Sequence, residues 1–286
     1  MTSAPAPAVV TIRPRSGWLS LGLVELWQHR ELVALLAARD VQVRYKQSLL
    51  GTAWALLQPL ATLAVFTGLF GALLAGGRMP TAPGVPYAVS TFSTLVVWQL
   101  FARAVTAGAD SLVVNQAIVT KVYLPRLAIP LAPVLASLVD FALGSVVLTA
   151  MLVWYGIAPG TAALILPILV LLTLGAALGV ALWLAAVNAL YRDVRLALPF
   201  AVQIWMLVTP VVYTASSVLT ELPQWLVRLY AWNPMAGIVE AFRFALVGGV
   251  SAPWDMLACS AASTAILLAS GLVVFRRLER VFADRV

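Results

Sequence analysis

The chain has 286 residues, of which 62% are hydrophobic and only 10% are charged, and its formal net charge is +7 at neutral pH. Soluble domains carry roughly 45–50% apolar and 25% charged residues, so this composition excludes an ordinary soluble domain and indicates a protein embedded in lipid. The positive charge is not gathered on any polar segment that could fold alone and bind nucleic acid.

Several kinds of catalytic site are also disfavoured. No G-x-x-x-x-G-K-[ST] pattern is present, so the chain has no P-loop for ATP. The single cysteine, Cys259, cannot form an intrachain disulfide, and the single histidine, His29, precedes the first apolar span. We therefore expect no metal and no cofactor in this chain, and a pore or scaffold instead of an enzyme.

The N-terminal part is expected to stay on the cytosolic side. Residues 1–16 lack the apolar core of a signal peptide, and their Pro, Ala and Ser content predicts a disordered tail. Residues 17–38 predict a helix with Leu19, Leu23 and Leu26 on one face, interrupted by Arg30. An amphipathic helix on the inner leaflet and a plain cytosolic helix are both open interpretations. With the basic block that follows, this unit covers 17–48.

The rest of the chain, 49–286, predicts an all-α integral membrane domain. Residues 49–74 form a run without formal charge. The run is longer than the roughly 20 apolar residues that a helix needs to cross a bilayer core. Prolines such as Pro133 and Pro210 are tolerated in such helices where neighbours satisfy the freed backbone groups. The predicted spans are 49–75, 85–107, 127–155, 161–187, 196–215 and 254–275.

The distribution of charge predicts the orientation. With both termini in the cytoplasm, only Arg78, Arg228 and Arg243 of the 18 lysines and arginines lie outside, and Arg103 counts as cytoplasmic. This arrangement satisfies the positive-inside rule. A seventh span over 232–249 would bury Glu240 and Arg243 and move the basic C-terminal end outside, which is costly. Residues 216–250 are therefore expected to form two short helices, broken at Asn233-Pro234, that dip into the outer leaflet.

Three polar or aromatic features leave alternatives open. Asp140 lies near the middle of span 127–155, and no second intramembrane charge is expected beside it. It is either an ion site or, as we favour, an acid hydrogen-bonded between helices or at a subunit contact. The loop 108–126 has a helical middle and is either a docking element or a plain surface loop. The aromatic residues either belong to the interfacial belt or stack on sugar rings. The channel candidates are Trp54, Gln58, Trp98, Trp183, Trp205 and Tyr213.

Four blocks, in order, resemble the transmembrane subunit of type-2 ABC exporters for polysaccharides such as O-antigen, teichoic acid or capsular chains. They are RDVQVRYKQSLLGTAWALLQPL at 39–60, NQAIVTKVYLPRLAIPLAPVLASLVDF at 115–141, NALYRDVRLALPFAVQIWMLVTPVVY at 188–213 and NPMAGIVEAFRFALVG at 233–248.

The resemblance implies roles that spacing alone does not show. An amphipathic gate helix would span 17–38, and the candidates for meeting a pyrophosphate at the inner gate are Arg39, Arg44, Tyr45 and Lys46. A coupling helix that docks on the ATPase would span 111–122. The ATPase-coupling candidates are Asn115, Gln116, Lys121, Tyr123, Pro125, Arg126, Arg192, Asp193 and Arg195. The outer-gate candidates are Asn233, Pro234, Glu240 and Arg243.

The implied assembly is a homodimer with two copies of a separate ATPase, which holds the ATP and Mg²⁺. It would carry an undecaprenyl-diphosphate-linked glycan across the bacterial inner membrane, and nucleic acid would be no partner. The alternatives are a type-2 ABC permease for a drug or another lipid, a secondary transporter that uses Asp140, and a membrane enzyme acting on lipid-linked sugars.

Overall fold

The computed structural model describes residues 23–46, 53–73, 85–121, 124–191, 193–216, 223–248 and 252–285. The predicted tail, 1–16, lies outside these ranges. The regular elements are α1 (Leu23–Gln28), α2 (Arg30–Tyr45), α3 (Ala53–Leu73), α4 (Tyr87–Val114), α5 (Gln116–Lys121), α6 (Ala128–Trp154), the 3₁₀ turn η1 (Thr161–Ile165), α7 (Leu166–Asn188), α8 (Asp193–Val208), α10 (Gln224–Ala231), α11 (Pro234–Val247) and α12 (Trp254–Arg285).

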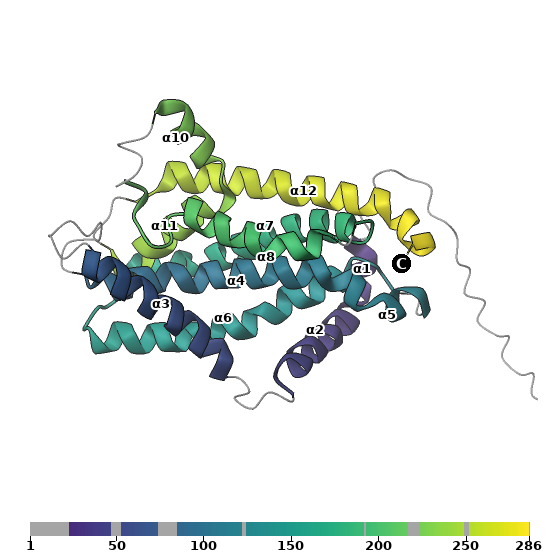
Figure 1. Ribbon diagram of the computed structural model, residues 1–286, viewed down its shortest axis with the longest axis horizontal. Helices are drawn as coiled ribbons and strands as arrows, with labels where there is room; N and C mark the ends of the chain where they lie inside the picture. The colour runs from purple at the N-terminus through teal and green to yellow at the C-terminus, as the bar shows by residue number, and fades with distance from the viewer. Residues whose placement is uncertain are drawn as a thin grey trace, which may run out of the picture.

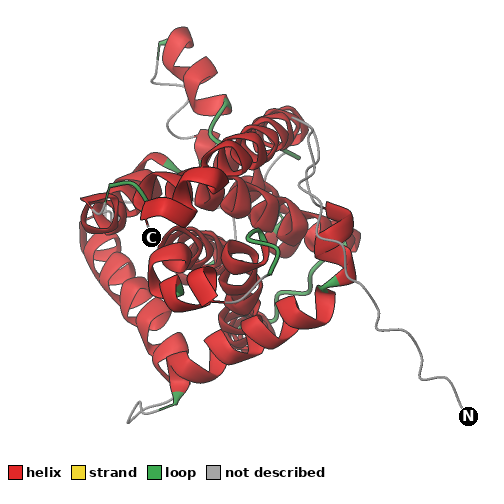
Figure 2. Ribbon diagram, turned by 90° about the vertical axis from the view of Figure 1, so that its right-hand side faces the viewer, coloured by secondary structure: helices red, strands yellow, loops and turns green. Residues whose placement is uncertain are grey.

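The long helices form a bundle (Figure 1). The ends of α1, α5 and α12 lie toward one end, and α10 and α11 lie at the other, while α2 lies obliquely to the long helices beneath α6. Figure 2 views the molecule from the end that carries the C-terminus and shows that the described regular elements are helices. The expectation of an all-α protein is thus confirmed for the described ranges.

Within those ranges, four helices are long and apolar enough to cross a membrane: Tyr87–Val114, Ala128–Trp154, Thr161–Asn188 and Trp254–Glu279. The first predicted span coincides with α3, which contributes the shorter apolar stretch Leu56–Gly68, and the fifth coincides with the 16-residue helix α8. Every predicted span therefore has a helix at its place in the chain. The total of six crossings stays a prediction.

Several boundaries differ from the predicted ones. Residues 17–22 of the predicted helix 17–38 lie outside the described residues. The described part is divided into α1 and α2 by a break at His29, and α2 continues through the basic block to Tyr45. The predicted coupling helix 111–122 is also wrong in extent, because α4 continues to Val114 and only α5 remains. The break comes at Asn115, whose side-chain amide folds back onto the Ser111 carbonyl.

The fifth and sixth spans are corrected at their C-terminal ends. α8 stops at Val208, seven residues before the predicted end at 215. Pro210 has no backbone N–H to continue the helix, and the carbonyls of the following turn are bonded by Arg243 instead. In contrast, α12 runs ten residues past the predicted end at 275, to Arg285.

α4 is the central helix and packs against both α6 and α7, while α7 packs against α12. The core residues along α4 include Phe92 and Phe101, which are fully buried. α7 and α12 approach closely at Gly179, where a Cβ atom would lie 2.7 Å from the backbone nitrogen of Leu268. Small residues at such contacts let helix backbones meet where lipid leaves no hydrophobic driving force between helices.

Candidate functional site

A cluster of charged side chains surrounds Asp140 on α6. Its Oδ1 accepts a hydrogen bond from the Tyr45 hydroxyl and forms an ion pair with Arg103 Nη1 at 3.0 Å, while Oδ2 accepts a hydrogen bond from Arg44 Nη1. Arg103 Nη2 also donates to Gln58 Oε1 at 3.1 Å. The side chains come from α2, α3, α4 and α6, so this "Asp140 cluster" joins four helices.

The cluster is open on its cationic side. The Asp140 side chain is 4% exposed, whereas the side chains of Arg103 and Arg44 are 19% and 29% exposed. Two guanidinium groups and one carboxylate leave a formal charge of +1. A small pocket borders the cluster between α3, α4 and α6; its lining residues are Pro59, Val96, Gln99, Leu100, Arg103, Asp140, Phe141 and Gly144.

This arrangement corrects one expectation and confirms another. The prediction that no second charge accompanies Asp140 is wrong, because α4 continues eleven residues beyond Arg103 and brings that arginine against the carboxylate. The favoured interpretation of Asp140, an acid hydrogen-bonded between helices, is confirmed. The position of Arg103 inside the predicted span 85–107 could have indicated a partner for Asp140, but Arg103 was counted among the cytoplasmic residues instead.

α2 is attached at a second point by Arg39. Its Nη2 donates to Asn115 Oδ1 at 2.6 Å and to Asp40 Oδ1 at 2.8 Å. Asn115 is the residue between α4 and α5, so the hydrogen bond ties α2 to the start of α5. Of the four inner-gate candidates, Arg39, Arg44 and Tyr45 are thus engaged with other helices, while Lys46 is exposed at the end of α2.

The predicted coupling residues fall into two groups at the same end of the bundle. Arg126 donates to the Glu279 carbonyl of α12, Pro125 is buried beside it, and Gln116 is exposed on α5. Tyr123, Arg192 and the side chain of Lys121 lie outside the described residues.

The second group surrounds Asp110 on α4, which sequence analysis did not single out. Arg195 Nε lies 3.5 Å from Asp110 Oδ2, and Asn188 Nδ2 donates to Asp110 Oδ1 at 3.1 Å. Asp193 is exposed in the first turn of α8. This group holds the α7–α8 connection against α4. No local signal marks Asp110, since its partners lie about 80 residues further along the chain.

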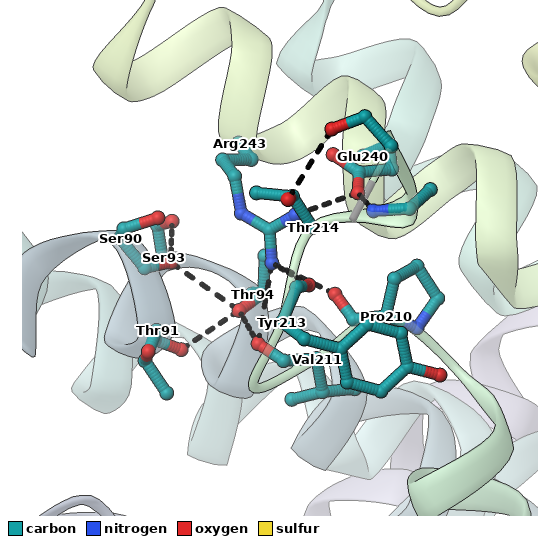
Figure 3. Close-up of polar contacts among 12 residues, drawn as sticks. Ser90, Thr91, Ser93, Thr94, Pro210, Val211, Tyr213, Thr214, Glu240 and Arg243 are labelled. Atoms are coloured by element: carbon teal, nitrogen blue, oxygen red, sulfur yellow. Dashed lines mark hydrogen bonds and ion pairs between the residues drawn. The ribbon is translucent and has the colours of Figure 1, made fainter. Parts of the chain in front are cut away.

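A contrasting cluster, drawn in Figure 3, lies around α11, which Figure 1 shows at the end of the bundle opposite α5. Arg243 and Glu240, three residues apart on α11, form an ion pair at 2.7 Å, and their side chains are 2% and 7% exposed. Arg243 Nη2 donates to the carbonyls of Pro210 and Tyr213 at 2.8 and 2.9 Å, and the Ala215 amide donates to Glu240. The predicted pairing of these two residues is confirmed, and this is the "Arg243 cluster".

The turn after α8 is held from α4 as well. Thr94 Oγ1 donates to the Val211 carbonyl at 2.6 Å, and the Tyr87 hydroxyl donates to the Val212 carbonyl at 3.0 Å. The carbonyls of this turn, which lie outside any helix, are thereby provided with side-chain donors from α4.

The predicted break at Asn233-Pro234 is confirmed. Asn233 Oδ1 accepts the Met235 amide, which makes it an N-cap, and Pro234 occupies the first position of α11. The same oxygen accepts the Trp205 indole N–H from α8, and Asn233 Nδ2 donates to Thr209 Oγ1. Thus α8 and α11 are fixed to each other through one asparagine.

The aromatic candidates separate by exposure. Trp98 is 2% exposed and packs against Phe101, which in turn contacts Trp205 edge-on, so Trp98 belongs to the interior of the bundle and offers no surface to a cargo. Trp54 and Trp183 are 53% and 38% exposed. Tyr213 is half-buried and its hydroxyl donates to the Leu207 carbonyl. In the described part of the chain, no group of three or more His, Cys, Asp or Glu side chains could hold a metal ion.

The chain is similar in sequence to membrane transport proteins over most of its length. The chain is 27% identical over 262 residues to the O-antigen export system permease protein RfbA of Myxococcus xanthus, covering 92% of this chain and 98% of the relative. It is 26% identical over 255 residues to the protein of the same name from Klebsiella pneumoniae, covering 89% and 94%. The polysialic acid transport protein KpsM of Escherichia coli is 23% identical over 252 residues, covering 86% and 93%. The sequence profile of the ABC-2 type transporter family matches residues 31–247, from α2 to the end of α11, and the chain therefore belongs to that family.

Proposed function

We propose that this chain is the channel-forming permease subunit of an ATP-driven exporter, which carries an undecaprenyl-diphosphate-linked polysaccharide of the O-antigen class across the bacterial inner membrane. The observation that supports this most is the similarity to two O-antigen export permeases over nearly their whole length. The polysialic acid transport protein supports a glycan as cargo over a drug, because all three relatives' names specify O-antigen export or polysialic acid transport.

The proposed assembly contains two copies of this chain and two ATPase subunits. Each copy would cross the membrane six times with both termini in the cytoplasm. α5 and the Asp110–Asn188–Arg195 group lie at the end of the bundle that this topology places inside, so they are the proposed contacts for the ATPase. α10 and α11 would form the outer gate, and Trp54 and Trp183 are the exposed aromatic candidates for sugar contact.

The cationic residues of α2 are the proposed contacts for the pyrophosphate of the cargo. Arginine presents several N–H donors in a planar fork that matches phosphate oxygens. Arg39 and Arg44 are held in place by Asn115 and Asp140, and Lys46 is exposed beside them. Neutralising Arg39, Arg44 and Lys46 together should reduce export without loss of ATPase binding. Arg30→Gln, an exposed cation at the start of the same helix, is the matched control.

The test begins with gentle purification of the tagged chain from its native membrane and mass spectrometry of what accompanies it. A P-loop ATPase in a mass of two plus two subunits is expected. The complex in liposomes should then move an undecaprenyl-diphosphate glycan to the far side only with ATP, as detected by a lectin. A chain that purifies alone and transports without nucleotide would contradict the proposal.

A secondary transporter centred on Asp140 is disfavoured by the geometry. The carboxylate is already neutralised by two arginines and bonded by a tyrosine, so it is poorly placed to exchange a proton or a cation. Asp140→Asn separates the two functions, because ion-coupled flux would be abolished while ATP-dependent transport would persist.

A further inference from the structure

We infer that Asp140 is an internal counter-ion for an anion site formed by Arg44 and Arg103, and that a pyrophosphate head displaces Asp140 from both arginines when the cargo enters. The inference rests on the proposed function for the identity of the cargo. It adds Arg103, on α4, to the binding residues, and gives Asp140 a part in release.

The geometry supplies the first argument. Two guanidinium groups from different helices converge on one carboxylate, one on each oxygen, as two guanidinium groups would converge on a phosphate. Carboxylate and phosphate are the two anions that the planar guanidinium fork fits. Asp140 therefore occupies, in the empty protein, the place of a phosphoryl group.

The charge supplies the second argument. The cluster has a formal charge of +1, so Asp140 satisfies the arginines without balancing them. An unpaired arginine within a membrane domain is costly, which explains why an empty anion site needs a counter-ion of its own. A pyrophosphate carries more negative charge than one carboxylate, so it can neutralise both arginines and leave Asp140 free to accept only from Tyr45.

Access supplies the third argument. The pocket between α3, α4 and α6 has Arg103 and Asp140 in its wall, and Gln99 and Pro59 also line it. Both arginines retain exposed surface, whereas the carboxylate has almost none. An incoming anion thus reaches the guanidinium groups first, and the displaced carboxylate stays behind them, ready to reclaim them when the anion leaves.

The experiment measures binding of undecaprenyl diphosphate to the full complex in nanodiscs of phosphatidylcholine, by native mass spectrometry without nucleotide. Arg103→Gln should weaken binding about tenfold, the loss expected for one charge-assisted hydrogen bond. Asp140→Asn should strengthen binding by a similar factor, because the competing anion is gone. Arg30→Gln, which removes an exposed charge remote from the cluster, should change neither.

The opposite changes in affinity expected for Asp140→Asn and Arg103→Gln distinguish an anion site from a structural ion pair. If the cluster were only a structural ion pair, Asp140→Asn and Arg103→Gln would both lower stability, and neither would bind more tightly. Unchanged or weakened binding in Asp140→Asn therefore overturns the inference. If Asp140→Asn does not fold, the double variant Asp140→Asn with Arg103→Gln is used, because it has the same formal charge of +1 in the cluster as wild type. Its affinity should lie between those of wild type and Arg103→Gln. An affinity no higher than that of Arg103→Gln alone overturns the inference.

Two further arms distinguish the source of the phosphate. Phosphatidylglycerol should compete poorly, since it carries one charge where the site accommodates more, and equal competition would assign the site to a bulk lipid headgroup instead. Inorganic pyrophosphate should compete with the lipid. Failure here is separable from failure of the proposed function. ATP-driven export of the undecaprenyl-diphosphate glycan together with unchanged binding in Asp140→Asn contradicts only the inference, whereas transport without ATP contradicts the function.

Discussion

The Asp140 cluster and the Arg243 cluster use the same chemistry for different ends. In the Arg243 cluster, one buried arginine meets one buried glutamate and its Nη2 donates to the carbonyls of Pro210 and Tyr213, so the formal charge is balanced and both side chains are shielded from solvent. In the Asp140 cluster, two arginines share one aspartate and both keep exposed surface. A balanced, buried ion pair fixes a turn, whereas an unbalanced, accessible one leaves a charge for a ligand.

Arg243→Met is the strongest test of this difference between the two clusters. The substitution removes the donors to the Pro210 and Tyr213 carbonyls and leaves Glu240 buried without its partner. Breaking a buried pair in this way costs about 3–5 kcal/mol. We expect the largest loss of thermal stability of any single change here, measured as the fraction of monodisperse protein that survives heating in detergent.

The double variant Glu240→Gln with Arg243→Met is the control. It leaves no uncompensated charge, so it should recover a substantial part of the lost stability. If Arg243→Met melts within one degree of wild type, the buried Arg243–Glu240 pair does not stabilise the turn as proposed.

Asp140→Asn should cost less, about 1–3 kcal/mol. The two arginines lose an anionic partner, but their exposed surface lets water and ions replace it. Because screening acts on partly exposed charges, the loss should shrink as salt is raised, while the loss in Arg243→Met should not. Thermal unfolding at low and high salt measures both, and equal salt dependence of the two variants would remove the distinction between the clusters.

Thr94→Val tests whether side chains of α4 help to hold the turn after α8. The hydroxyl donates to the Val211 carbonyl, and its loss should cost about 1 kcal/mol. Thr106→Val is a matched control on the same helix, because the Thr106 hydroxyl donates only to Ala102 within α4. If the two variants have the same melting temperature, the turn does not depend on the hydrogen bond from Thr94.

Arg39→Gln should have the smallest effect, below about 1 kcal/mol, because its ion pair with Asp40 is partly exposed to solvent and joins neighbouring residues of one helix. A double-mutant cycle with Asn115→Ala isolates the interhelical hydrogen bond. We expect a favourable coupling of a few tenths of a kcal/mol from melting temperatures. A coupling of zero would mean that α2 is held to the bundle by the Asp140 cluster and by apolar packing alone.

The sequence predicted what depends on local chemistry. The break before α11 follows from an asparagine cap and a proline at adjacent positions, and the Glu240–Arg243 pair follows from helical spacing of three. The positions of the apolar helices follow equally from hydropathy. Each of these features is contained within one turn or one continuous stretch of chain.

What the sequence did not predict depends on distant residues. Arg44 and Arg103 reach Asp140 across 96 and 37 positions, and no local pattern records that meeting. Arg103 was counted as cytoplasmic under the positive-inside rule although it lies within the predicted span 85–107, and its ion pair with Asp140 on α6 places it inside the bundle. The early end of α8 similarly depends on Arg243, more than 30 residues away, as well as on Pro210.

The two attachments of α2 have a mechanical consequence. Arg39 bonds the α4–α5 junction and Arg44 bonds α6, and five residues of helix separate them, about 7.5 Å along the axis. A helix of that length does not bend, so α2 is a short rigid strut between the surface where α5 lies and the charged centre of the bundle. A displacement of α5 would be transmitted through α2 to the arginine at the far end of the strut.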